Sequence, residues 1–199
     1  MKKLNLIITL CLSTAAITGV CLKTIQAQTS LTGSVAIPAE QPASKVDFDA
    51  YEKLAKEVGE YRKDRLIPLE TFSKFSREDN VIILDTRSEA MFKAKHVKGA
   101  INLNFSDFTQ ANLAKIIPSA DTKILIYCNN NFDNDQIYFV TKAALPPVAL
   151  KSGKELTLAL NIPTFINLYG YGYKNVYELA ELISVFDPRI VFEGTSVGL

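Results

Sequence analysis

One cysteine stands at the point where an apolar run turns into a polar loop. The segment 123–135 begins with Lys-Ile-Leu-Ile-Tyr, reaches Cys128, and continues with residues that are mostly asparagine and aspartate. An apolar run without alternation is typical of a central parallel strand that is covered on both faces. Ligands of open α/β sheets bind at the carboxyl ends of such strands. We therefore expect Cys128 to lie at a site where a thiolate could act as a nucleophile.

The N-terminal segment has the features of a secretion signal. Two lysines precede an uncharged, mostly apolar stretch at 6–22, and Ala27 ends a sequence suited to cleavage. We predict a signal peptide over residues 1–27, a periplasmic or secreted protein, and no membrane attachment after cleavage. A retained membrane anchor and a lipoprotein modified at Cys21 are the alternatives.

Cleavage after Ala27 would leave Cys128 as the only thiol. An unpaired cysteine in an oxidising compartment is exposed to oxidation, so we expect it to be either buried and inert or used. The same cleavage takes the formal net charge from +1 to about −2, which gives no basic surface for nucleic acid. With 48% hydrophobic and 22% charged residues, the rest is predicted to form one globular domain.

The remaining sequence predicts a tether followed by alternating strands and helices. Residues 28–46 are rich in small and turn-forming residues, which indicates a flexible tether, and residues 47–199 form the predicted domain. Buried strands are expected at 81–84, 123–127 and 175–179, with an edge strand at 66–67. Helices are expected at 47–61 with Asp49 and Glu52 as a capping box, at 68–75, at 89–94, at 106–117 with Ser106 as its N-cap, at 162–169 with Asn161 as its N-cap, and at 180–185. This order predicts a parallel sheet with helices on its faces.

Four short motifs in one order carry a resemblance to a known family. They are Asp85-Thr86-Arg87, His96-Val97-Lys98-Gly99-Ala100-Ile101-Asn102, Ile126-Tyr127-Cys128 and Gly172-Tyr173-Lys174-Asn175-Val176-Tyr177. Together they resemble the rhodanese-like domain over about residues 64–183, apart from an insertion at about 136–160 that contains a strand-like run, 137–140. The resemblance implies a three-layer α/β domain with a central, mostly parallel five-stranded sheet. It also implies that Cys128 accepts sulfane sulfur as a persulfide, cradled by the backbone N–H groups of its loop.

The loop after Cys128 departs from the family pattern. Asn131 stands where the family has a glycine, and Asp133 stands where it has an arginine. The loop therefore offers no cation to an anionic donor, and its aspartates favour the protonated thiol. The insertion also argues against a helix N-terminus that points at Cys128. The predicted substrate-binding residues are Asn129, Asn130, Asn131, Phe132 and Asp133, and Asp85 with Arg87 is expected to form a supporting structural pair near the site.

The sequence leaves two functions open. The first is a sulfur- or thiol-transfer protein in which Cys128 forms a persulfide with a donor other than thiosulfate. The second is a catalytically inactive rhodanese-like module of the cell envelope that binds a partner through its Asn/Asp loop and insertion. The expected partners are a small sulfur donor or a protein thiol, and the protein is expected to be a monomer. Whether it is an enzyme is left open.

Other chemistries have weaker support. His96 is the only histidine, so a Cys–His dyad is conceivable, but the resemblance assigns this residue to a structural turn. A zinc site would need more His and Cys residues. Asn129, Asn131, Asp133 and Asp135 alternate like the ligands of a calcium loop that lacks its central glycine and closing glutamate. No nucleotide, haem or flavin motif is present, so we expect no metal and no cofactor.

Overall fold

The computed structural model describes residues 43–144 and 156–198. The predicted signal peptide, most of the predicted tether and the middle of the predicted insertion lie outside the described residues. From Lys45 onward, the described residues form one compact unit. No helix in the described part of the chain combines the length and the apolar character needed to cross a membrane.

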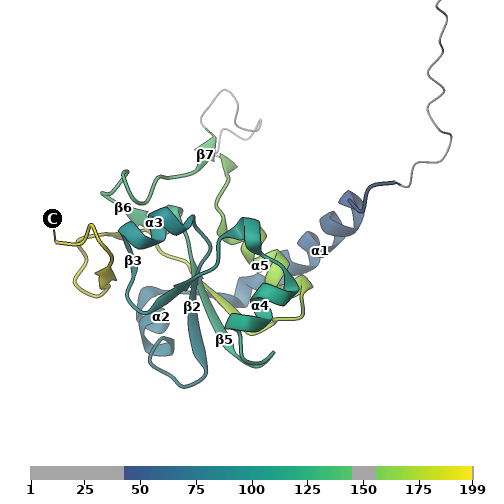
Figure 1. Ribbon diagram of the computed structural model, residues 1–199, viewed down its shortest axis with the longest axis horizontal. Helices are drawn as coiled ribbons and strands as arrows, with labels where there is room; N and C mark the ends of the chain where they lie inside the picture. Colours follow the sequence, from purple (N-terminus) through teal and green to yellow (C-terminus); the bar gives the residue numbers. More distant parts are fainter. Residues whose placement is uncertain (1–42, 145–155, 199) are drawn as a thin grey trace, which may run out of the picture. The chain divides into compact units, whose positions relative to one another are not determined.

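The centre of this unit is an all-parallel sheet of five strands in the order β1-β9-β5-β2-β4 (Figure 1). Its strands are β1 (Leu66–Ile67), β2 (Val81–Asp85), β4 (Ala100–Asn102), β5 (Lys123–Tyr127) and β9 (Val176–Leu179). The predicted α/β fold with a parallel five-stranded sheet is confirmed. As expected from its unbroken apolar run, β5 lies in the middle, hydrogen-bonded to β2 on one side and to β9 on the other.

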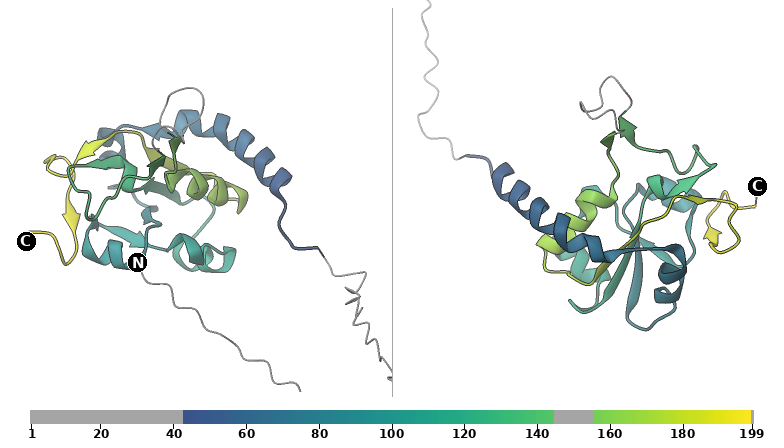
Figure 2. Two further views of the ribbon diagram at one scale, coloured as in Figure 1. Left: turned by 90° about the horizontal axis from the view of Figure 1, so that it is seen from above. Right: turned by 180° about the vertical axis from the view of Figure 1, so that it is seen from behind.

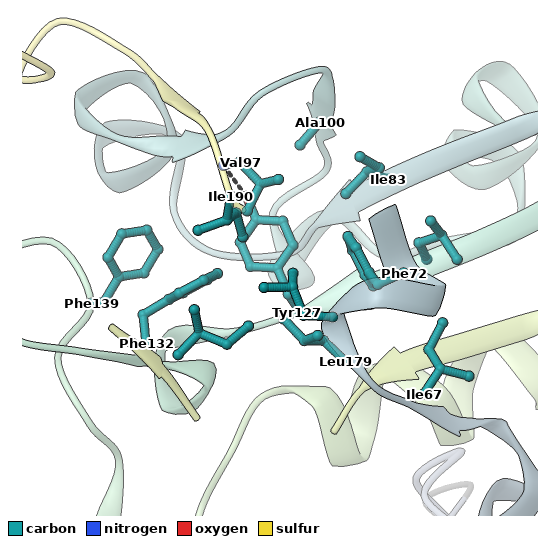
Figure 3. Packing of buried hydrophobic residues seen from close by; sticks show 13 residues of the cluster. Ile67, Phe72, Ile83, Val97, Ala100, Tyr127, Phe132, Phe139, Leu179 and Ile190 are labelled. Atoms are coloured by element: carbon teal, nitrogen blue, oxygen red, sulfur yellow. Dashed lines mark hydrogen bonds between the residues drawn. The ribbon is translucent and has the colours of Figure 1, made fainter. Parts of the chain in front are cut away.

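Alternate side chains of β5 pack into two separate hydrophobic cores. Ile124 and Ile126 pack on the face covered by three helices, α1 (Phe48–Tyr61), α4 (Gln110–Ile116) and α5 (Asn161–Gly170) (Figure 2). Leu125 and Tyr127 pack on the opposite face, with Leu69 and Phe72 of α2 (Leu69–Phe75) and Phe92 of α3 (Glu89–Ala94). Figure 3 shows Tyr127 in this second core beside Val97 and Phe132. Both faces of the sheet are therefore covered, as a parallel sheet requires.

Six short strands outside the sheet form three pairs. The strand β3 (His96–Val97) pairs antiparallel with β11 (Phe192–Glu193), and β6 (Phe132–Asp133) pairs parallel with β10 (Ile183–Ser184). The strands β7 (Ala143–Ala144) and β8 (Leu156–Thr157) pair antiparallel on either side of the undescribed residues 145–155. The prediction of a helix at 180–185 is therefore wrong. The apolar Ile183 is buried in the short strand β10, where it pairs with β6.

Three local predictions need correction. The hydroxyl of Thr109, and not that of Ser106, accepts from a backbone N–H of α4, while residues Phe105–Asp107 form the separate 3₁₀ turn η2. Asp47 caps α1 by accepting from the Ala50 N–H, so the capping box expected at Asp49 is absent. The expected strand at 137–140 is a turn, because the Asp135 carboxylate accepts from the Ile137 and Tyr138 N–H groups.

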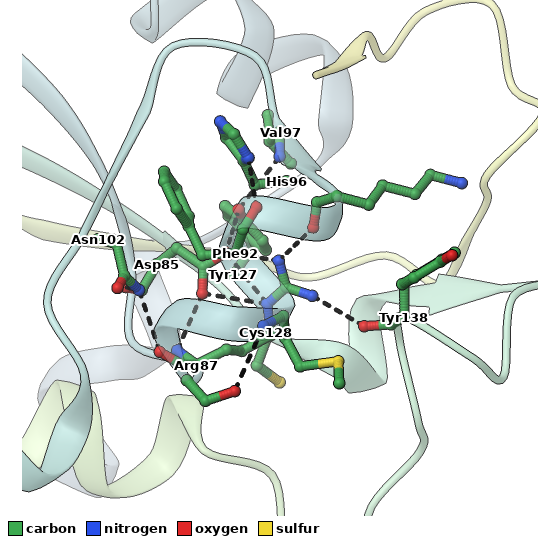
Figure 4. A network of polar contacts seen from close by, with 12 residues as sticks. Asp85, Arg87, Phe92, His96, Val97, Asn102, Tyr127, Cys128 and Tyr138 are labelled. Carbon is green, nitrogen blue, oxygen red and sulfur yellow. Dashed lines mark hydrogen bonds and ion pairs between the residues drawn. The ribbon is translucent and has the colours of Figure 1, made fainter. Parts of the chain in front are cut away.

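The end of β2 is fixed by a buried ion pair. Asp85 and Arg87 are 0% and 4% exposed, and their closest polar atoms, Oδ2 and Nη2, lie 2.7 Å apart (Figure 4). The remaining guanidinium donors reach the carbonyl oxygens of Tyr138 at 2.9 Å and Lys95 at 2.7 Å. The Tyr127 hydroxyl donates to Asp85 Oδ2 at 2.5 Å and accepts from the Val97 N–H at 3.1 Å. The expected structural pair is present, and it ties β2, β5 and the segments after them into one network.

We predict that Arg87→Met destabilises the fold by about 3–5 kcal/mol, because it leaves the Asp85 carboxylate buried without a cation. Urea denaturation of the purified variant measures this change. Arg189→Met is the matched control, since Arg189 binds Asp187 with the same spacing and two-pronged geometry at the surface. Its effect should be much smaller. Equal losses in the two variants would contradict a structural role for the buried pair.

Candidate functional site

Cys128 directly follows β5 at the carboxyl edge of the sheet. It is the N-cap of the 3₁₀ turn η3 (Asn129–Asn131), and it lines a pocket of about 550 Å³. The residue is only 2% exposed, so its thiol is largely desolvated. Among the described residues it is a free cysteine. The position at the end of a central strand is the one that the sequence predicted.

Asn131 holds the cysteine loop against the end of β9. Its Oδ1 accepts from the Cys128 N–H at 3.0 Å, and its Nδ2 donates to the carbonyl oxygens of Leu179 at 2.7 Å and Glu181 at 3.2 Å. A fourth bond comes from the side chain of Asn161, at 3.1 Å. Both amide donors of Asn131 are thus used inside the protein. The residue that replaces the family's glycine works here as a clamp between the cysteine loop and β9.

The N-terminus of α5 lies beside the thiol, contrary to the expectation drawn from the insertion. Burial raises the pKa of Cys128 above its ordinary value, whereas the backbone N–H groups of Asn130, Asn161 and Leu160 lower it. Two of these three amides come from the N-cap and the first residue of α5, and the helix dipole adds to their effect. The net direction is upward, since desolvation is the largest influence and the charge of Glu178 also raises this pKa.

Asn161 is not the N-cap of α5 that its residue type predicts. The N-cap is Leu160, which makes no side-chain capping bond, and Asn161 is the first helical residue. Its Nδ2 donates to Asn131 Oδ1 and to Glu178 Oε1, at 3.1 and 3.2 Å. Because both of these neighbours are acceptors, the orientation of the amide is fixed. Its Oδ1 is buried and has no donor among the described residues.

An ion pair that the sequence analysis missed lines the same pocket. Arg62 follows the last residue of α1 in the 3₁₀ turn η1 (Arg62–Arg65), and Glu178 lies in β9. The guanidinium Nε and Nη2 donate to the two carboxylate oxygens, each at 2.5 Å. Glu178 is 6% exposed. The signal that could have found the pair is Glu178 itself, a charged residue inside a strand that is otherwise apolar.

The other predicted substrate-binding residues divide between loop, core and surface. Asn130 exchanges two hydrogen bonds of 3.0 Å with the backbone of Lys142, which fastens the loop to the start of the insertion. Phe132 is fully buried and packs edge-on against Tyr127, although it also borders the pocket. Asp133 is exposed at the pocket rim. Asn129 lines a second pocket of about 540 Å³, and its buried Oδ1 has no partner within the described residues.

His96 makes no described contact with Cys128. Its ring stacks on Phe92 with centroids 3.7 Å apart, Nδ1 lies 2.6 Å from the Phe92 carbonyl oxygen, and Nε2 lies 3.3 Å from Glu193 Oε1. Asp135, the last residue of the calcium-like alternation, binds Lys95 at 2.9 Å. Over residues 43–144 and 156–198, no group of three or more His, Cys, Asp or Glu side chains is arranged to hold a metal ion.

We predict that Asn131→Ala destabilises the protein by about 2–4 kcal/mol, because it leaves the Cys128 N–H and the Leu179 carbonyl without their partner. Urea denaturation measures the change. Asn129→Ala in the same turn is the control, and we expect it to change stability by less than about 1 kcal/mol, since the Asn129 Oδ1 has no partner to lose. The reverse ranking would contradict the clamp.

We also predict that Cys128 alkylates slowly at neutral pH. The raised pKa keeps the thiol protonated, so the rate with iodoacetamide should go on rising above pH of about 8.5, the ordinary pKa of a cysteine. Glu178→Gln removes one cause of the rise and should move the profile toward lower pH. A wild-type profile with its midpoint below that ordinary value would show that the amides outweigh burial.

Comparison with known proteins identifies the fold's family. The rhodanese-like domain family model matches residues 69–181, more than half of the chain. Among solved structures, the BH2092 protein from Bacillus halodurans is 16% identical, with 66% of this chain and 74% of that chain covered and a TM-score of 0.40. No match was found among curated proteins. On the family match, the chain belongs to the rhodanese-like domain family.

Proposed function

We propose that this protein transfers sulfane sulfur through a persulfide on Cys128, with a donor other than thiosulfate. The observation that carries the proposal is the place of Cys128, directly after β5 and lining a pocket, where the backbone N–H groups of Asn130, Asn161 and Leu160 lower the pKa of its thiol against the effect of burial. Oriented amides of this kind stabilise a sulfur anion without a charged side chain. They would serve the thiolate and the persulfide that follows from it.

The proposed step is a simple exchange. The Cys128 thiolate attacks the outer sulfur of a persulfide R–S–SH, the S–S bond of the donor breaks, and R–S⁻ leaves. The leaving thiolate takes up the proton that Cys128 gave up. The products are Cys128–S–SH and R–SH, so the sulfur atom moves with no net oxidation or reduction.

The charges around the pocket argue against thiosulfate as the donor. Asp133 lies at the rim, and the charge of Arg62 is already balanced by Glu178. A dianion would therefore meet no uncompensated cation in the part of the wall that the structure describes. A donor of low net charge, or a persulfide carried by a protein, meets no such repulsion.

A binding module without catalysis is the second candidate, and the burial of the thiol favours it. At 2% exposure and with a raised pKa, Cys128 has the properties of an inert cysteine. Exposed apolar side chains at the pocket, Leu66, Ile162 and Leu182, would suit contact with a protein partner. Under this hypothesis Cys128 is a relic of an active ancestor and the loop serves recognition.

The proposal includes export to the periplasm or outside the cell, with residues 1–27 as the signal peptide and residues 28–46 as a tether. It also includes action as a monomer on a small sulfur donor or a protein thiol. Both parts rest on the sequence alone. After cleavage of the signal peptide, Cys128 would be the one thiol of the mature chain, so no other cysteine of the chain would compete for the sulfur in that compartment.

We predict that the mature protein gains the mass of one sulfur atom when it is treated with a small-molecule persulfide, and gains little or none with thiosulfate. Intact-protein mass spectrometry measures the adduct, and cyanolysis of the product confirms sulfane sulfur. The Cys128→Ser variant should gain none. Absence of the adduct with persulfide, polysulfide and thiosulfate alike would reject sulfur transfer and leave the binding module as the function to pursue.

A further inference from the structure

The pocket beside Cys128 carries a pair of opposite charges whose hydrogen bonds are only partly used. Arg62 donates to Glu178 through Nε and Nη2, and within residues 43–144 and 156–198 no hydrogen bond involves its Nη1. The Arg62 side chain is 29% exposed, in contrast to 7% for Glu178. The free end of the guanidinium is therefore open to a ligand, and the carboxylate is largely covered.

A buried acceptor without a donor belongs to Asn161, another residue that lines the pocket. Asn161 is 2% exposed, and its Nδ2 is committed to Asn131 and Glu178. Turning the amide over would set its oxygen against two other oxygens, so the buried Oδ1 stays an acceptor that no described residue satisfies. Buried polar atoms in folded proteins are nearly always paired, and an exception at a pocket calls for a ligand or water.

The two features together select a ligand with two opposite charges. The free Nη1 of Arg62 offers N–H donors to a carboxylate, while Asn161 Oδ1 and the adjacent Glu178 charge suit an ammonium group. The ion pair has no net charge. Glu178 would repel a ligand that is only an anion, and Arg62 would repel a ligand that is only a cation. An α-amino acid carries both groups on one carbon atom.

We propose that the Cys128 pocket takes the persulfide of a free α-amino acid, cysteine persulfide in chemical class, whose carboxylate binds Arg62 and whose ammonium group binds Asn161 beside the negative charge of Glu178. This inference rests on the proposed sulfur transfer and names its donor. The bond changes are those of the exchange above, with free cysteine as the R–SH that leaves. The head group holds the donor, and the outer sulfur faces Cys128.

The test compares three persulfides that differ only in their charged groups. They derive from cysteine, from cysteamine, which has the ammonium group alone, and from 3-mercaptopropionate, which has the carboxylate alone. The rate of sulfur gain at Cys128 is followed by intact-protein mass spectrometry. We expect the cysteine persulfide to react about tenfold faster than either analogue, the ratio that loss of one charge-assisted hydrogen bond gives.

Variants locate the selectivity. Arg62→Gln with Glu178→Gln keeps a hydrogen-bonded pair but removes both charges, and it should make the three rates nearly equal. Glu178→Gln alone should raise the rate of the carboxylate-only donor, because Arg62 is then uncompensated. Lys63→Gln is the matched control, since Lys63 is the next residue of the same turn, pairs with Glu60 at the surface and does not line the pocket. It should retain the wild-type order.

The outcomes separate this inference from the proposed function. An adduct with all three donors at equal rates in the wild type would overturn the amino-acid head group and leave sulfur transfer intact. A doubly substituted variant that keeps the wild-type preference would overturn the head group in the same way. No adduct with any donor would overturn both. The wild-type ratio and the single Glu178→Gln variant decide the matter even if the doubly substituted variant fails to fold.

Discussion

Both faces of β5 are apolar, so this strand is stable only in the middle of the sheet, and the site depends on that constraint. With β2 and β9 hydrogen-bonded on either side, the residue after the strand has to emerge at the carboxyl edge between two other strand ends. The Asp85–Arg87 pair fixes one of these ends, and Asn131 joins the cysteine loop to the other. Contacts of the fold itself thus hold Cys128 in place without any ligand, and few of them come from its own loop.

The same position sets the chemical problem of the site. The thiol of the buried Cys128 loses hydration, and desolvation favours the neutral thiol. The protein opposes this with backbone amides, two of which come from the N-cap and the first residue of α5, rather than with a loop cation. The charge of Glu178 acts on the thiol, and it is balanced by its ion pair with Arg62. Such a site would hold a sulfur anion only modestly well, which suits a donor that brings its own binding groups and suits thiosulfate poorly.

Features that depend on short-range pattern could be predicted from the sequence. The run before Cys128 identified a buried strand, and the motif from Asp85 to Arg87 identified a strand-end pair. Features made by distant segments could not. Arg62 and Glu178 are 116 residues apart in the chain, and nothing in the sequence around Arg62 indicates a partner. Asn161 has the residue type of a helix cap, since asparagine is common there; in the fold, its amide is drawn instead to two buried acceptors. The sequence also could not predict that the N-terminus of α5 lies beside Cys128, since the residues before this helix show no regular hydrophobic periodicity.

The most direct test of sulfur binding at this site is a crystal structure of the protein after treatment with cysteine persulfide. We expect an additional sulfur atom bonded to Cys128 Sγ and within hydrogen-bonding distance of the N–H groups of Asn130, Leu160 and Asn161. An unmodified thiol, or an added sulfur atom that turns away from these three amides, would contradict the claim that backbone dipoles hold sulfur at the end of β5.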